Sequence, residues 1–450
     1  MGSLIPLIIA LLKPLTMEGV YCRHPVGEAM ANKDFEKKLD LYAQLIVKVG
    51  LNLQPGQTLV ANGKGFTRGV ALEAAPLMRR IAHHAYVAGA KLVDVIWDDP
   101  ELMLERIKYA PKDSFGEYPT WRTRGLAEYV SAGNAMLTVY SEDPDFYKKQ
   151  DTEIINKVQN VMQLNLAPTS EQLMMNTFNW SLFAVPVEGW AKKVFPKLTP
   201  AKALEKLWNT IFTLCRLDQK DPIKAWEKHI SQLHARSHYL TDKQYYALKY
   251  TAPGTNLTLG LADGHVWESA RISSTRGVSY VANLPTEEVF SLPHKGRVDG
   301  TVTASMPLSY AGRLIEGISV TFKDGKAVDY KAKKSGEILK GVFDTDEGSR
   351  SLGEVALVPQ SSPIAKSKMM FYNTLFDENA ANHIAIGRGY RSTMKGGEQM
   401  TAEQFAAAGG NESLVHVDFM IGSDKMDIDG VTKAGKTEPV MRKGEWAFKI

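Results

Sequence analysis

The chain has 450 residues, of which 44% are hydrophobic and 23% charged, and a formal net charge of +4. This length suits two or three globular domains, and the small net charge gives no reason to expect nucleic-acid or anionic-membrane binding. Cys22 and Cys215 are the only cysteines, which excludes a disulfide framework or a cysteine-rich zinc site. We therefore expect a cytoplasmic globular protein with no nucleic-acid or membrane partner.

An apolar run at residues 4–12 lies near the start of the chain. It is far too short to span a bilayer, and no basic segment precedes it, as a secretory signal would require. We therefore predict neither a membrane anchor nor a signal peptide from this run.

Strands and helices alternate in the first part of the chain. Apolar residues at helical spacing predict a helix over residues 34–51, and another over about 71–88. Strands are predicted at 58–61, 91–97 and 135–140. This alternation indicates an α/β domain with a mainly parallel sheet covered by helices.

The loop at residues 62–65, Asn-Gly-Lys-Gly, follows the first predicted strand. Its glycines lack the spacing of a Walker A motif, and no Gly-x-Gly-x-x-Gly opens the next helix. We favour a plain turn between strand and helix over a phosphate loop, with Lys64 placed where it could line a cleft.

Residues 145–243 are predicted to be largely helical, apart from one strand at 180–185. His229, His234 and His238 fall on the last of these helices, at a spacing that is uneven for one metal-binding face. We expect solvated or capping roles for them.

After Tyr245 the predicted elements are short and rich in strands, and Asp324-Gly325 indicates a hairpin turn. We therefore predict an α/β domain with a helical insertion over residues 30–243. A mostly β (α+β) domain is predicted over residues 244–450.

Two histidines in this second domain lie close in sequence to carboxylates. His416 and Asp418 alternate with the apolar Val417, so a strand would place both on one face. Glu378 and His383 share a segment that is either a short helix or a turn, and the chain has no His-Glu-x-x-His motif. Imidazole with carboxylate suits zinc, cobalt or manganese and favours a divalent metal centre. The alternative is one histidine satisfied by backbone in the core and the other on the surface.

Acidic residues also interrupt two apolar, strand-like runs. Glu287 and Glu288 lie in the run 284–290, and Glu354 lies in the run 350–359. A glutamate in such a strand is costly unless it is paired or bound to a cation. Adjacent residues of a strand point to opposite faces, so only one of Glu287 and Glu288 can reach a shared site.

These motifs, in this order, resemble a known family. The segments that carry the resemblance are residues 285–290, 353–359, 377–381, 411–418 and 420–423. They are similar to those of the thermophilic-type metalloaminopeptidases, the aminopeptidase T, AmpS and PepS group. The resemblance begins near Asp34 and reaches the C-terminus, so we interpret residues 1–29 as an extension outside the family.

The resemblance implies a metalloaminopeptidase that releases N-terminal residues from short peptides with a free N-terminus. It implies two divalent ions that activate a bridging water, with zinc or cobalt as the ions and manganese or magnesium as alternatives. It also implies a homodimer, and it makes residues 244–450 the metal-binding catalytic domain. The spacing to Glu354 in the family favours Glu288 over Glu287. At matching positions the implied metal ligands are Glu288, Glu354, His383, Tyr390, His416 and Asp418.

Two roles and two rival functions stay open. Glu378 is either a further ligand or the general base that takes a proton from the bridging water. Tyr390 is a ligand, a catalytic hydrogen-bond donor to the oxyanion, or a tyrosine packed under a loop. The rival functions are another metal-dependent amide or ester hydrolase and a non-catalytic metal-binding module. Oxygen donors dominate the set, whereas structural zinc sites are usually closed by Cys and His, which favours catalysis.

Overall fold

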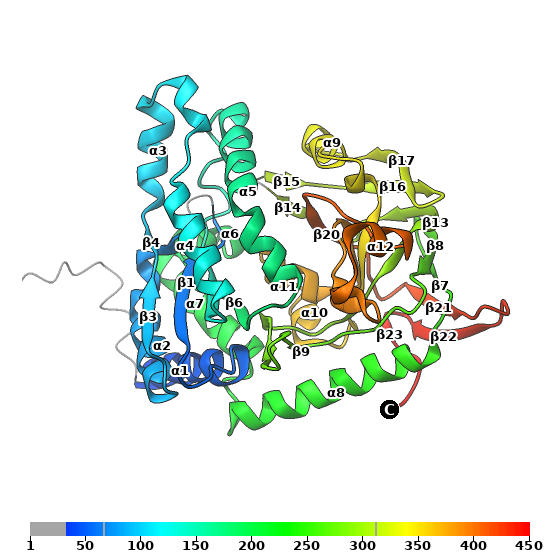
Figure 1. The fold of residues 1–450 in the computed structure, drawn as a ribbon, viewed down its shortest axis with the longest axis horizontal. Helices are drawn as coiled ribbons and strands as arrows, with labels where there is room; N and C mark the ends of the chain where they lie inside the picture. Colours follow the sequence, from blue (N-terminus) through cyan, green and yellow to red (C-terminus); the bar gives the residue numbers. More distant parts are fainter. Residues whose placement is uncertain (1–32, 66–67, 311–312) are drawn as a thin grey trace, which may run out of the picture.

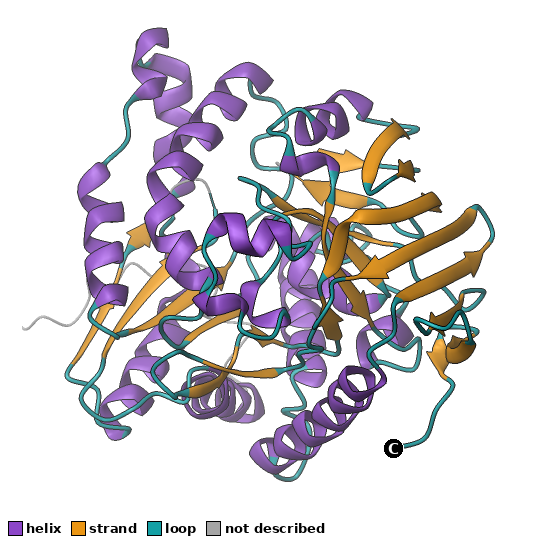
Figure 2. Cartoon of the chain, turned by 45° about the vertical axis from the view of Figure 1, so that its right-hand side comes forward, coloured by secondary structure: helices purple, strands orange, loops and turns teal. Residues whose placement is uncertain are grey.

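The computed structural model describes residues 33–65, 68–310 and 313–450. Helices surround a parallel sheet in the α/β region (residues 33–243), and antiparallel strands dominate the β region (residues 244–450), which lies beside it (Figures 1 and 2). The predicted fold class is confirmed. The predicted extension, residues 1–29, lies outside the described residues, and the domain boundary at residue 243 stays a prediction.

Four strands of the α/β region and β11 of the β region form a parallel sheet in the order β11-β6-β5-β1-β3. The central strands are apolar and buried, as expected for a parallel sheet covered on both faces. The chain places β3 on one side of β1 and β5 on the other. The carboxyl ends of β1 and β5 therefore meet at a topological switch point, where open α/β sheets bind ligands. The strand bounds are β1 Thr58–Gly63, β3 Leu92–Val95, β5 Ala135–Tyr140, β6 Trp180–Ala184 and β11 Asn283–Leu284, with a two-stranded pair β2 Val70–Ala71 and β4 Trp97–Asp98.

Helices cover this sheet, and several begin at a capping aspartate. The carboxylates of Asp99, Asp151 and Asp221 accept backbone N–H bonds in the first turns of α3, α5 and α8. The helices of the α/β region are α1 Lys33–Leu45, α2 Ala75–Val87, α3 Pro100–Tyr109, α4 Thr120–Ser131, α5 Thr152–Met174, α6 Glu188–Val194, α7 Pro200–Leu214 and α8 Pro222–Lys243.

The β region is built on an eight-stranded sheet in the order β17-β16-β13-β8-β7-β21-β22-β23. The predicted hairpin at Asp324-Gly325 joins β16 to β17, and both residues have positive φ, as a type I′ turn requires. The bounds are β7 Ala247–Ala252, β8 Thr255–Leu261, β13 Pro293–Thr303, β16 Ser319–Lys323, β17 Lys326–Lys331, β21 Asp427–Val431, β22 Thr437–Arg442 and β23 Glu445–Trp446. The smaller elements are β9 Arg271–Ser273, β10 Ser279–Val281, β14 Leu308–Tyr310, β15 Arg313–Ile315, α9 Gly336–Phe343, α10 Pro363–Ser367, α11 Thr374–Asp377 and α12 Ala402–Ala407.

Helix α8 joins the two regions. It runs beneath both in Figure 1 and packs against α1 on one side and β12 (Val289–Ser291) on the other. One continuous hydrophobic core extends through both regions. No helix within the described ranges is both long enough and apolar enough to cross a membrane.

Candidate metal centre

A four-stranded antiparallel sheet in the β region carries most of the predicted ligands. Its order is β12-β18-β19-β20, with β18 at Leu352–Leu357, β19 at His383–Gly387 and β20 at His416–Met420. Glu354 lies opposite Ala385, and Ala385 lies opposite Asp418. Opposite residues share a face, so two carboxylates flank one methyl group in a row across three strands.

The two histidines lie on the same face of this sheet. His383 is opposite Ala356, and His416 is opposite Gly387. The small side chains among these charged residues leave open volume above the sheet. The other face is apolar and buried in the core. The strand register that buries the apolar side chains therefore also places the carboxylates and imidazoles on the opposite face.

A β-bulge at Gly353 turns Glu354 to the polar face. Leu352 pairs with Ile386 on the apolar face, whereas Glu354, two residues later, pairs with Ala385 on the polar face. In a regular strand residues two apart share a face, so the extra residue is needed. A Cβ on Gly353 would lie 2.3 Å from the carbonyl oxygens of residues 387 and 388, which only glycine avoids.

Glu288 reaches the same place from the segment just before β12. The Thr286 hydroxyl donates to Glu288 Oε1 at 3.4 Å, and Glu288 Oε2 lies 3.2 Å from His383 Nε2. The preceding residue, Glu287, points elsewhere. Its Oε1 accepts from Arg216 at 2.7 Å, and its Oε2 lies 3.6 Å from His229 Nε2.

Two groups of possible metal ligands share one carboxylate. The first group is Glu288, Glu354 and His383, and the second is Glu354, His416 and Asp418. Glu354 Oε1 lies 3.4 Å from His383 Nε2, and its Oε2 lies 3.6 Å from His416 Nε2. His416 Nε2 is also 3.5 Å from Asp418 Oδ1. We call these five residues the metal cluster. Glu354 thus faces one imidazole with each of its two carboxylate oxygens.

Backbone contacts orient both imidazoles of the metal cluster. His383 Nδ1 lies 3.1 Å from the Ala381 carbonyl oxygen, and His416 Nδ1 lies 2.7 Å from the Arg388 carbonyl oxygen. A carbonyl can only accept, so each Nδ1 carries the hydrogen. In the neutral imidazole each Nε2 then carries the lone pair and faces the carboxylates, which is the tautomer that a metal-binding histidine uses.

Two buried oxygens of the metal cluster lack a donor. Glu288 Oε2 and Asp418 Oδ1 accept no hydrogen bond from any described residue. An unsatisfied buried oxygen is costly, and a cation would satisfy it. Burial raises the pKa of Glu354; the hydrogen bond with His383 and the charge of His416 oppose this shift, and the charges of Asp418 and Glu288 add to it. Burial lowers the pKa of His416, but Asp418 and Glu354 outweigh it and raise that pKa to about 9.

The structure places the two remaining predicted residues beside this cluster. Glu378 is held by the side-chain amides of Asn283 and Asn379, at 3.4 and 3.5 Å, and burial raises its pKa well above the usual range. The Tyr390 ring centroid lies 5.2 Å from that of His416. Glu378 belongs to neither of the two ligand groups, and both Glu378 and Tyr390 line the same cavity.

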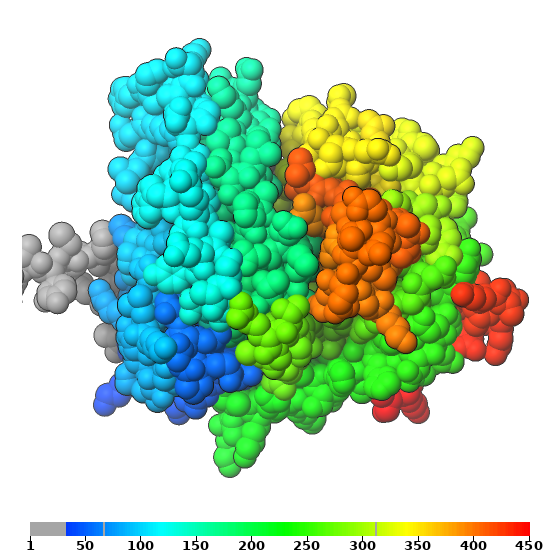
Figure 3. Space-filling view, viewed as in Figure 1, coloured from blue at the N-terminus to red at the C-terminus, as the bar shows by residue number. Residues whose placement is uncertain are grey.

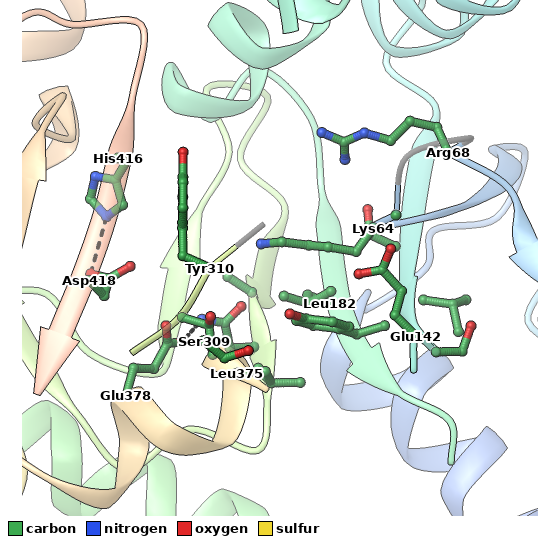
Figure 4. Close-up of a pocket in the computed structure, with 18 of the residues that line it drawn as sticks. Lys64, Arg68, Glu142, Leu182, Ser309, Tyr310, Leu375, Glu378, His416 and Asp418 are labelled. Carbon is green, nitrogen blue, oxygen red and sulfur yellow. Dashed lines mark hydrogen bonds and ion pairs between the residues drawn. The ribbon is translucent and has the colours of Figure 1, made fainter. Parts of the chain in front are cut away.

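The metal cluster opens onto a cavity of about 670 Å³ between the two regions. Figure 3 shows the surface hollowed between α5 and the orange segment near residue 400 of the β region. In Figure 4, His416 and Asp418 project into this cavity from β20, and Lys64 projects toward them from the opposite wall. Both regions therefore build the site.

Two features of this neighbourhood differ from the sequence predictions or were not foreseen. The expectation that His229 is solvated or capping is wrong, because its side chain is only 12% exposed and its Nε2 donates to the Thr286 carbonyl oxygen at 2.8 Å. Glu268 was not singled out. It lines the cavity, accepts from the Ser392 hydroxyl at 2.8 Å, and burial raises its pKa to about 7. Its sequence, Val-Trp-Glu-Ser-Ala, offered the same signal as Glu354, an acid in an apolar run.

A cluster of carboxylates and imidazoles that faces a ligand-sized cavity defines a metal-dependent enzyme rather than a closed structural site. Comparison with known proteins identifies the family within this class. Residues 35–446 match the thermophilic metalloprotease (M29) family, so the chain belongs to that family.

Relatives agree with this assignment. The chain is 47% identical over 416 residues to aminopeptidase 2 of Geobacillus stearothermophilus and 44% identical over 414 residues to aminopeptidase AmpS of Bacillus subtilis. Each alignment covers 92% of this chain and 99% of the relative. The structure of wild-type AmpT from Thermus thermophilus superposes with a TM-score of 0.84 at 41% identity, covering 92% of this chain and 100% of that one. The predicted family and the predicted enzyme class, a metalloaminopeptidase, are confirmed.

Proposed function

We propose that this metalloaminopeptidase releases N-terminal residues from short peptides and works with two divalent cations in the metal cluster. The observation that carries the proposal is the pair of ligand groups joined through Glu354. One group alone would suit a single ion, whereas a shared carboxylate with an imidazole on each side suits two.

The charges of the cluster support two ions. Glu288, Glu354, Asp418 and Glu378 bring four negative charges when ionised, and two divalent cations would balance them. The two oxygens without donors, Glu288 Oε2 and Asp418 Oδ1, belong to different ligand groups, so each group has an unmet need for a cation. Mixed oxygen and imidazole donors suit zinc, cobalt or manganese better than magnesium, which prefers oxygen alone.

The proposed roles of the protein side chains follow from their positions around the cavity. The bound ions would polarise the scissile carbonyl and ease the ionisation of water. Glu378, whose raised pKa suits proton transfer, takes the proton of the attacking water. The Tyr390 hydroxyl donates a hydrogen bond to the oxyanion or completes the ligand set. The acids that line the cavity attract the ammonium group of a free N-terminus.

The remaining proposals rest on the family resemblance. We propose a cytoplasmic homodimer in which residues 30–243 form one domain and residues 244–450 form the catalytic domain. Light scattering on the purified chain tests the dimer directly, because a monomeric mass would contradict it.

An assay with aminoacyl-p-nitroanilides tests the function. We expect hydrolysis that needs added cobalt or zinc, stops with a chelator, and does not occur when the substrate amine is acetylated. Cleavage of the acetylated substrate would indicate another amide or ester hydrolase. Metal binding at two ions per chain without any turnover would indicate a non-catalytic metal-binding module.

A further inference from the structure

Lys64 lies on the cavity wall opposite the metal cluster. It directly follows β1, at the switch point between the carboxyl ends of β1 and β5. Its backbone N–H donates to the Val139 carbonyl of β5 at 3.0 Å, and Gly63 N–H donates to the Arg68 carbonyl at 3.2 Å. These bonds fix the base of the side chain, which points across the cavity toward β20 in Figure 4.

Lys64 and Arg68 are the only lysine and arginine among the described residues that line this cavity. Neither forms an ion pair at 4 Å or less with an acid in the described ranges, although the cavity is rich in carboxylates. Arg68 Nε is buried and has no hydrogen-bond partner among the described residues. Glu142 is the acid on this wall whose charge acts on both cations. Glu73, Asp98, Asp143 and Glu188 also line the cavity from the α/β region, so Lys64 and Arg68 are the described side chains of this wall that can attract an anion.

The surroundings make these two cations available to a ligand. Water reaches the Lys64 side chain within the cavity, yet the surrounding protein lowers its pKa by desolvation, and the negative charge of Glu378 across the cavity opposes that shift. Two neighbouring cations repel each other unless an anion lies between them. The wall is therefore arranged to receive an anionic group that approaches from the metal cluster.

A short peptide carries such a group. With the amine and scissile bond at the metal cluster, the C-terminal carboxylate of an extended dipeptide lies roughly 3–4 Å beyond the scissile bond, and that of a tripeptide lies roughly 7 Å beyond it. Elsewhere in the cavity that carboxylate would meet acids, which repel it. Beside Lys64 and Arg68 it would gain a charge-assisted hydrogen bond, and a longer peptide would present an uncharged peptide group there instead.

We propose that Lys64, with Arg68, binds the C-terminal carboxylate of dipeptide and tripeptide substrates and so sets a preference for short peptides. This inference rests on the proposed function, because it takes the reaction to occur at the metal cluster. It assigns substrate selection to the α/β region and hydrolysis to the β region.

The test compares leucyl-leucine with leucyl-leucinamide, which differ only in the terminal charge. We expect Lys64→Met to lower kcat/KM for the free acid at least tenfold more than for the amide, mainly through KM. Lys64→Arg should restore most of the preference. Lys91→Met is the matched control, because Lys91 is exposed just before β3, at the amino ends of the parallel strands, whereas Lys64 follows the carboxyl end of β1.

Equal losses on both substrates would overturn the proposal and indicate that Lys64 acts on the reacting carbonyl. Unchanged kcat/KM values for both the free acid and the amide would overturn it as well. If Lys64→Met does not fold, Arg68→Gln makes the same comparison. Failure of the wild-type enzyme to hydrolyse either substrate with added metal would instead count against the proposed function.

Discussion

Two adjacent glutamates enter two buried clusters that resemble each other in composition and differ in charge balance. Glu287 belongs to an ion-pair cluster with Arg216 and His229, and its side chain is 5% exposed. Glu288 belongs to the metal cluster, and its side chain is 9% exposed. Both clusters combine carboxylate with imidazole, yet only the ion-pair cluster contains an arginine or lysine.

The difference shows how a buried acid should be interpreted. Glu287 is neutralised by the guanidinium of Arg216, 2.7 Å away, and His229 turns its ring to a backbone carbonyl. In the metal cluster no lysine or arginine of the described chain pairs with an acid, and two oxygens lack donors. A buried carboxylate beside a histidine therefore indicates a metal only where the chain supplies no counter-charge.

The largest expected effect is on activity, from Glu354→Gln. We expect kcat/KM to fall by on the order of 10³-fold, because the variant lacks the charge shared by both ligand groups. Bound metal measured by atomic emission should fall with it, while circular dichroism stays unchanged. Full activity in this variant would remove Glu354 from the centre.

The next effect separates the adjacent glutamates. Glu287→Gln should lower the free energy of unfolding by about 3 kcal/mol, because it leaves the buried Arg216 charge unpaired. Glu288→Gln should lower the free energy of unfolding of the metal-free protein far less, because it removes one of several mutually repelling acids. The same substitution should abolish metal binding. Urea unfolding of both metal-free variants makes the comparison, which fails if their stabilities change equally.

Adding metal distinguishes the ion-pair cluster from the metal cluster in a second way. Zinc at 100 times its dissociation constant should stabilise the wild-type protein by about 2.7 kcal/mol, since only the folded state presents the site. The same stabilisation should persist in Glu287→Gln and disappear in Glu354→Gln. A gain in Glu354→Gln equal to that of the wild-type protein would place the ion elsewhere.

The smallest effect concerns pH. Burial, with Arg216 nearby, lowers the pKa of His229 to about 3, so below pH 6.5 the unfolded chain binds a proton that the folded chain excludes. Stability should therefore fall by up to about 2 kcal/mol as the pH falls from 6.5 to 5, at about 1.4 kcal/mol per unit. Metal-free His229→Gln should lack this component, which parallel urea titrations at pH 7 and pH 5 would measure. Identical pH slopes would contradict a buried neutral imidazole.

Much of the site could be predicted because its polar residues interrupt the apolar pattern of buried strands. Glu354 in an apolar strand and the alternation of His416 with Asp418 are visible in the sequence alone. What could not be predicted depends on tertiary packing. The bulge at Gly353 decides the face of Glu354, and Arg216, distant in sequence, decides the partner of Glu287. That Lys64 and the metal cluster line the same cavity depends on how the two regions pack.

The fold class was predictable for a related reason. Continuous apolar strands between amphipathic helices identify a parallel sheet, and in the β region Asp324-Gly325 identifies an antiparallel hairpin from two residues. His229 was misjudged because a helix pattern gives the spacing of its residues but not which neighbour covers them.

The glycine at position 353 lets one strand serve two purposes that a regular strand would couple. Leu352 contributes to the hydrophobic interior, while Glu354, two positions later, contributes to chemistry on the other side. Substitutions at Leu352 can therefore be selected for packing without reorienting the carboxylate, and the catalytic side can adapt to a different ion without disturbing the interior. Because Gly353 has no side chain, the residues that pack the core and those that serve catalysis can evolve separately within one six-residue strand.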